Sequence, residues 1–117
     1  MIGSTRREYP NDADGDVLQR LHDSGFDFAS RHDVDFYCYA SDYAKAEKIC
    51  VVASKQGYEC DISVDEEASD PLTKYSVYMT SKIFVTYDEV MERQVSLNKL
   101  LFDFNTKCDG WGVMLNA

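Results

Sequence analysis

The sequence lacks the features that mark membrane and secreted proteins. It has no N-terminal apolar run of signal-peptide length and no apolar stretch long enough to cross a bilayer. The four cysteines lie far apart and form no C-x-x-C pair; they are Cys38, Cys50, Cys60 and Cys108. We therefore expect a soluble, cytoplasmic protein whose cysteines are free thiols rather than a disulfide framework.

Metal-binding and catalytic patterns are also missing. Zinc sites need cysteine or histidine ligands in close pairs, and neither the cysteines nor His22 and His32 supply one. The sequence contains no nucleophile elbow, phosphate-binding loop or zinc-protease motif. His32 next to Asp33 could act as a base, but a histidine beside aspartates more often has no catalytic role. The sequence thus predicts no metal, no cofactor and no catalytic residue, and an enzyme that uses His32 remains an alternative.

Basic residues are scarce. Lysine and arginine total 12 against 21 aspartates and glutamates, which gives a formal net charge of −9. Such a charge repels phosphate backbones, so we expect no direct binding to nucleic acid. It would attract a basic partner, although net negative charge can also do no more than keep a protein in solution.

The length and composition fit one domain. The chain has 117 residues, of which 44% are hydrophobic, enough for a core without disulfides or metal. Residues 1–11 show no periodicity and are predicted to be a flexible leader. Residues 12–117 are predicted to form a single domain.

Residues 31–40 give the clearest structural signal, because apolar and polar side chains alternate as in a strand with one packed face. The packed face is small and apolar: Val34, Phe36, Cys38 and Ala40. The opposite face is acidic and aromatic: Asp33, Asp35, Tyr37 and Tyr39. Such a strand belongs at the centre of a sheet that is covered by helices on one side only.

The rest of the chain supplies helices and strands in an order that indicates a fold. Capping residues and apolar spacing predict helices over residues 12–25, 41–57 and 86–104. Alternation predicts strands over residues 58–65, 74–82 and 108–115, with 83–85 leaving the sheet. The resulting order is that of an α+β ferredoxin-like sandwich, βαββαβ with a four-stranded antiparallel sheet, preceded by an extra N-terminal helix. Its first and third strands are central.

Asp109-Gly110-Trp111-Gly112 allows two interpretations. Glycines beside a tryptophan in a strand indicate a bulge or a close backbone approach. Trp111 either packs in the core or lies exposed at a binding rim, and we favour packing because tryptophan is mostly buried.

Several short stretches, in this order and spacing, are similar to one known family. They are Asp14-Gly15-Asp16, Gly25-Phe26-Asp27-Phe28, His32-Asp33-Val34-Asp35-Phe36, Gly57-Tyr58-Glu59 and Asp109-Gly110-Trp111-Gly112. From about Asp12 to its end the chain resembles the ribonuclease E inhibitor family, regulator of ribonuclease E activity B (RraB). The resemblance implies a ferredoxin-like fold and a non-catalytic protein that binds ribonuclease E and lowers its cleavage of messenger RNA. Some members carry an acidic C-terminal tail, whereas this sequence ends at Ala117.

The polar sheet face is the candidate partner-binding surface, with six predicted contact residues: Asp35, Tyr37, Tyr39, Glu59, Asp61 and Tyr78. Aromatic and acidic side chains together suit a protein partner that presents arginines. The alternatives are a solvated sheet face with ordinary tyrosine pairs, and stacking of RNA bases. The fold also permits a homodimer, and a homodimeric small-ligand sensor is the second candidate function.

Overall fold

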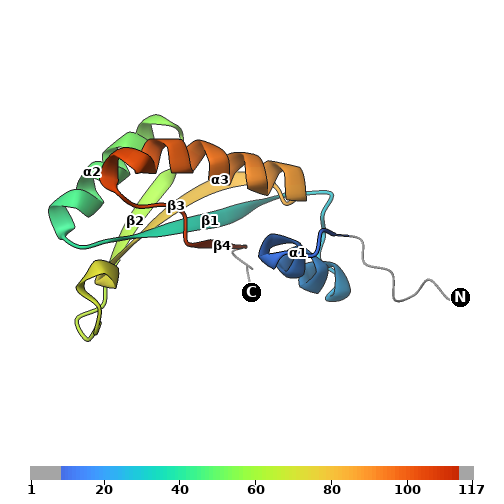
Figure 1. The fold of residues 1–117 in the computed structure, drawn as a ribbon. Coiled ribbons are helices and arrows are strands. Elements are labelled where there is room, and N and C mark those ends of the chain that lie inside the picture. Colours follow the sequence, from blue (N-terminus) through green and yellow to red (C-terminus); the bar gives the residue numbers. More distant parts are fainter. Residues whose placement is uncertain (1–8, 114–117) are drawn as a thin grey trace, which may run out of the picture.

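The computed structural model describes residues 9–113 as a four-stranded sheet with helices against it (Figure 1). The elements in chain order are α1 (Ala13–Asp23), β1 (Arg31–Ala40), α2 (Tyr43–Lys55), β2 (Glu59–Val64), η2 (Pro71–Thr73), β3 (Tyr75–Phe84), α3 (Tyr87–Leu101), η3 (Phe102–Phe104) and β4 (Gly110–Val113). The strand order is β2-β3-β1-β4, and every neighbouring pair is antiparallel. This topology confirms the ferredoxin-like sandwich with central β1 and β3 and an additional N-terminal helix.

β1 has the two faces that its alternation predicts. Val34, Phe36 and Cys38 are fully inaccessible to solvent, and Ala40 is 2% exposed. The intervening side chains are partly exposed on the opposite face. Burial of the first set against the helices stabilises the domain by about 25 cal/mol for each Å² of apolar surface removed from water.

β3 is longer than its alternation predicts. Residues 83–85 were expected to leave the sheet, but β3 continues to Phe84, so the prediction is wrong for Ile83 and Phe84. The reason is the length of β1, whose first residues Arg31 and His32 pair with Phe84 and Ile83. Ile83 is 2% exposed and belongs to the core.

β4 is shorter than the predicted strand over residues 108–115. The ladder to β1 runs from Gly110 to Val113, where Val113 lies opposite Val34. The last two residues of the predicted strand, Met114 and Leu115, lie outside the described residues.

Each helix has its N-cap within one residue of the predicted start. Asp12 and Asp42 each accept a hydrogen bond at 2.7 Å from the backbone amide three residues on, and Thr86 accepts one at 3.1 Å from Glu89. Each cap satisfies an amide that has no partner inside its helix. Within residues 9–113 no helix is long and apolar enough to cross a membrane.

Left-handed residues follow the helices where the sequence indicates. Gly25, with φ 81°, follows the C-cap of α1, and Gly57, with φ 94°, follows the C-cap of α2. The third helix was expected to run to residue 104, but α3 ends at Leu101 and tightens into η3 before Asn105, at φ 55°. Glycine and asparagine adopt this conformation at low cost.

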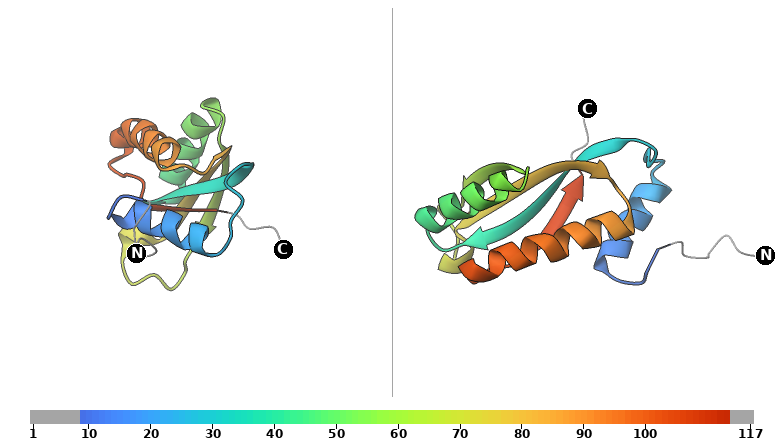
Figure 2. Two further views of the ribbon diagram at one scale, coloured as in Figure 1. Left: turned by 90° about the vertical axis from the view of Figure 1, so that its right-hand side faces the viewer. Right: turned by 90° about the horizontal axis from the view of Figure 1, so that it is seen from above.

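α2 and α3 cover the same face of the sheet and leave the other uncovered by them (Figures 1 and 2). The core lies between these two layers. Ile49 and Ala53 of α2 and Leu97 and Leu101 of α3 are at most 1% exposed. The layer arrangement therefore leaves the polar side chains of β1, β2 and β3 on an open surface.

α1 lies beyond one end of the sheet, beside the N-terminal end of α3 (Figure 2, right). Asp14 accepts hydrogen bonds from Trp111 Nε1 at 2.7 Å and Gln94 Nε2 at 3.0 Å. The Tyr87 hydroxyl donates to Asp12 at 2.6 Å. Trp111 is partly buried and packs against the core, and its indole N–H links β4 to α1 through Asp14.

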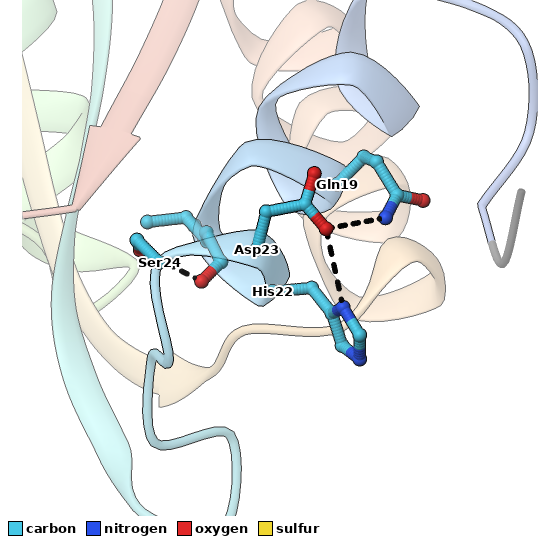
Figure 3. A network of polar contacts seen from close by, with 5 residues as sticks. Gln19, His22, Asp23 and Ser24 are labelled. Carbon is cyan, nitrogen blue, oxygen red and sulfur yellow. Dashed lines mark hydrogen bonds and ion pairs between the residues drawn. The ribbon is translucent and has the colours of Figure 1, made fainter. Parts of the chain in front are cut away.

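The C-terminal end of α1 carries a small network of polar contacts (Figure 3). Gln19 Nε2 donates to Asp23 at 3.1 Å, and His22 Nδ1 lies 3.6 Å from the same carboxylate. The Ser24 hydroxyl donates to the Leu21 carbonyl at 2.8 Å. These groups are exposed, so each contact contributes little to stability.

Candidate functional site

The structure brings all six predicted contact residues onto the sheet face opposite α2 and α3, which we call the open face: Asp35, Tyr37, Tyr39, Glu59, Asp61 and Tyr78. They form registered rows across three strands. Asp61 lies opposite Tyr78, which in turn lies opposite Tyr37. In the next row Glu59 lies opposite Thr80, which lies opposite Asp35. Residues opposite one another in adjacent strands are within side-chain contact distance.

The three tyrosines form a cluster centred on Tyr37. Its ring centroid is 6.0 Å from that of Tyr39 and 6.0 Å from that of Tyr78, at interplanar angles of 76° and 46°. Burial, followed by the nearby charge of Asp109, raises the pKa of Tyr37 above its ordinary value. The phenol therefore stays neutral at physiological pH and presents a hydroxyl donor on an apolar ring.

The Tyr37 ring lies against the backbone of Gly110 on β4. Gly110 is not among the predicted contact residues. A Cβ atom at Gly110 would lie 2.5 Å from the Tyr37 hydroxyl oxygen and 2.8 Å from Cζ. At Gly112, two residues further on, an added Cβ would meet nothing within 4 Å. The close approach indicated by the glycines of 109–112 thus occurs at Gly110, where it lets the Tyr37 ring lie across β4.

The carboxylates of the open face differ in their burial and in the hydrogen bonds that they accept within the protein. Asp35 is partly buried and accepts a hydrogen bond from the Thr80 hydroxyl, a partner that the sequence could not reveal. Asp61 accepts at 3.1 Å from the amide of Ile62. Glu59 and Asp61 are exposed on β2. The carboxylates of Glu59 and Asp61 can therefore contact a partner without breaking buried contacts of the fold.

One end of the same sheet surface is basic. The Arg31 guanidinium lies 5.2 Å from the Phe84 ring centroid, and Lys82 lies opposite Asp33. The six predicted contact residues include neither Arg31 nor Lys82. The negative charge is therefore concentrated around the tyrosine cluster and β2.

The cysteines are structural groups. Cys38 is fully buried, and burial raises the pKa of the Cys38 and Cys108 thiols to about 12. Burial, with neighbouring Cys60, also raises the pKa of Cys50 to about 12. Residues 9–113 contain no group of three or more histidine, cysteine or acidic side chains arranged to hold a metal ion. Asp12, the N-cap of α1, and Asp14, in its first turn, accept hydrogen bonds from protein donors.

Cys38 is expected to resist alkylation in the native protein. A pKa of about 12 in place of 9.0 leaves about a thousandfold less thiolate at pH 8, and the thiolate is the reactive form. Iodoacetamide should modify Cys38 at least about 100-fold more slowly in the native protein than in urea, as followed by peptide mass spectrometry. Equal rates would contradict this assignment. Unfolding returns the Cys38 pKa to near 9.0. The buried neutral thiol therefore makes its full contribution to the free energy of unfolding below pH 9, and that contribution is lost as the pH rises from 9 towards 12.

His32 takes part in local structure. Its Nε2 lies 2.7 Å from the Asp27 carbonyl oxygen, and its ring centroid lies 4.3 Å from that of Phe26. Asp27 in turn accepts hydrogen bonds from the Ser30 hydroxyl and the Ala29 amide, which lower the pKa of its carboxyl group. These contacts fix the turn that leads into β1.

A small hollow borders the open face at Tyr39. It has a volume of about 220 Å³, below the roughly 300–1,000 Å³ of ordinary ligand pockets. Leu72 and Thr106 are among its lining residues, and the Thr106 hydroxyl donates to the Tyr39 carbonyl at 2.9 Å. The open face thus offers a broad contact surface with a shallow recess at one edge, a form that suits a protein partner better than a small molecule.

Comparisons with known proteins give one consistent result. The family model described as "Regulator of ribonuclease activity B" matches residues 11–113. A protein of the same name from Pseudoalteromonas translucida (strain TAC 125) is 25% identical over 97 residues, which cover 83% of this chain and 87% of that relative. The match spans α1, all four strands and the open face.

Proposed function

The chain belongs to the regulator of ribonuclease activity B family, and from this premise we propose that it binds ribonuclease E and lowers the cleavage of RNA by that enzyme. In this proposal the chain performs no catalysis. It acts by occupying a surface of the nuclease or of its assembly and so hinders the handling of RNA there.

The open face carries the proposal. Arginine side chains of the nuclease would stack on Tyr37 and Tyr78 and form charge-assisted hydrogen bonds with Asp61 and Glu59. The registered rows place these groups next to one another without any rearrangement. Tyrosine and arginine are among the residues that supply most of the binding energy in protein interfaces. Basic segments that bind RNA are the natural partners, because they carry the opposite charge.

Net charge would contribute mainly to the rate of association. A protein of net charge −9 attracts a basic segment over distances of about one Debye length, which is about 10 Å at 0.1 M salt. The proposal therefore requires binding that weakens as salt is raised.

A direct binding assay tests the proposal. Purified ribonuclease E is immobilised, the chain is passed over it at low and at raised salt, and RNA cleavage is measured with and without the chain. We expect binding that falls with salt and a slower cleavage rate. Absence of binding at low salt would overturn the proposal, and binding that ignores salt would overturn its electrostatic part.

The Gly110→Ala variant is expected to weaken this binding about tenfold while leaving the domain folded. The added methyl group would push the Tyr37 ring from its place, and a ring end can move without large cost to the fold. Gly112→Ala is the matched control, because its methyl group meets nothing within 4 Å. Affinities from surface plasmon resonance that are equal for the two variants would show that the position of Tyr37 does not matter.

A further inference from the structure

The C-terminal end of α3 exposes an apolar surface on the helical side of the sheet. Phe102 in η3 is 78% exposed, and Val95, two helical turns earlier, is 53% exposed. Two shallow hollows, of about 510 and 560 Å³, adjoin these side chains and share Asn98 and Phe102 as lining residues. We call this surface, formed by Val95, Asn98, Lys99, Phe102 and Lys107, the Phe102 patch.

The floor of the Phe102 patch is fixed by the fold. Asn98 Oδ1 accepts a hydrogen bond at 2.8 Å from the amide of Cys108, which ties the connection to β4 against α3. Leu101, beside Phe102, is fully buried, and Asn105 turns the chain in a left-handed conformation. Phe102 therefore projects from anchored backbone, which lowers the entropy cost of binding at this place.

The charge around the patch is opposite to that of the whole protein. Lys99 and Lys107 line the two hollows, and Lys45 and Lys48 line an adjoining one that shares Asn105. Two carboxylates also line that third hollow: Asp42 and Asp103. Asp42 already caps α2. Four of the 12 basic residues thus gather at one end of a chain whose net charge is −9.

We propose that the Phe102 patch docks an acidic, amphipathic segment of a partner protein. An apolar side chain of the segment lies between Val95 and Phe102, and its carboxylates pair with Lys99 and Lys107. RNA fits less well, because a single exposed ring is no stacking platform for successive bases. The proposal is independent of ribonuclease E, since the open face lies on the other side of the sheet.

Selection from a peptide library tests the proposal. Random peptides of about twelve residues, displayed on phage, are selected on the immobilised full-length chain, and the most enriched peptide is synthesised for fluorescence anisotropy. We expect enriched peptides that combine acidic residues with a large apolar residue. Phe102→Ala, and separately Lys99→Glu with Lys107→Glu, should weaken binding about tenfold or more. Val51→Ala, which truncates another exposed apolar residue on α2, is the matched control and should change nothing.

Several outcomes would overturn the proposal. They are selection that enriches no peptide, enriched peptides without acidic residues, and a peptide that binds Phe102→Ala as well as the unaltered chain. Binding of single-stranded RNA that depends on Phe102 would assign the patch to nucleic acid instead. A dimer that dissociates on Phe102→Ala substitution, seen by sedimentation, would assign it to a second copy. No nuclease enters these measurements, so their failure is separate from failure of the proposed function.

Discussion

Replacing Glu59 and Asp61 together with lysine is expected to lower the affinity for ribonuclease E by about 100-fold, or about 2.7 kcal/mol. Both side chains are exposed on β2, in the rows that contain Thr80 and Tyr78. The substitution removes two attractive charges and introduces two repulsive ones at the edge of the tyrosine cluster. Because the sites are exposed, the fold should be retained. Affinity is measured by surface plasmon resonance over a range of salt concentrations.

The matched control reverses two carboxylates on the other side of the molecule. Glu47 on α2 and Glu92 on α3 are both exposed, and their replacement with lysine changes the net charge by the same amount. We expect a modest loss of affinity, mostly in the association rate. If the control variant lost as much affinity as the Glu59 and Asp61 variant, total charge rather than the open face would govern binding.

Phe36→Ala is expected to destabilise the domain by about 3–5 kcal/mol. Phe36 is the largest of the fully buried side chains and lies at the centre of β1, between the sheet and the helices. Its removal leaves a cavity that the packed helices cannot close. A loss of this size is a large share of the roughly 5–15 kcal/mol by which domains are stable, so the variant will be marginal at 37 °C.

Urea unfolding followed by circular dichroism measures this effect. Phe102→Ala removes the same side chain from a position that is 78% exposed and should change the free energy of unfolding by no more than about 0.5 kcal/mol. Similar losses for the two variants would contradict the assignment of the core to the α2 and α3 side of the sheet. A small change in the free energy of unfolding of Phe36→Ala would contradict it as well, whatever the result for Phe102→Ala.

The fold was predictable from the sequence because its signals are local and agree with one another. Alternation in residues 31–40 identifies the buried and open faces of β1, and Asp42 and Thr86 mark helix starts through their own side chains. Alternation in two strands also predicts that Tyr37 and Tyr78 share a face. The register shows them directly opposite one another, as expected for central β1 and β3.

The remaining features depend on contacts between distant parts of the chain. The end of β3 at Phe84 follows from the length of β1, because Phe84 pairs with Arg31, the first residue of β1. The bond from Trp111 to Asp14 joins residues 97 positions apart, and Tyr37 lies over Gly110 only because β4 pairs with β1.

The most direct test of the account is oxidative footprinting of the tyrosines in the complex with ribonuclease E. Hydroxyl radicals modify exposed side chains, and mass spectrometry reads the extent at each tyrosine. Binding through the open face predicts protection of Tyr37, Tyr39 and Tyr78, with Tyr43 on α2, which is 51% exposed, unchanged. Protection of Tyr43 while the three open-face tyrosines stay as reactive as in the free protein would contradict it.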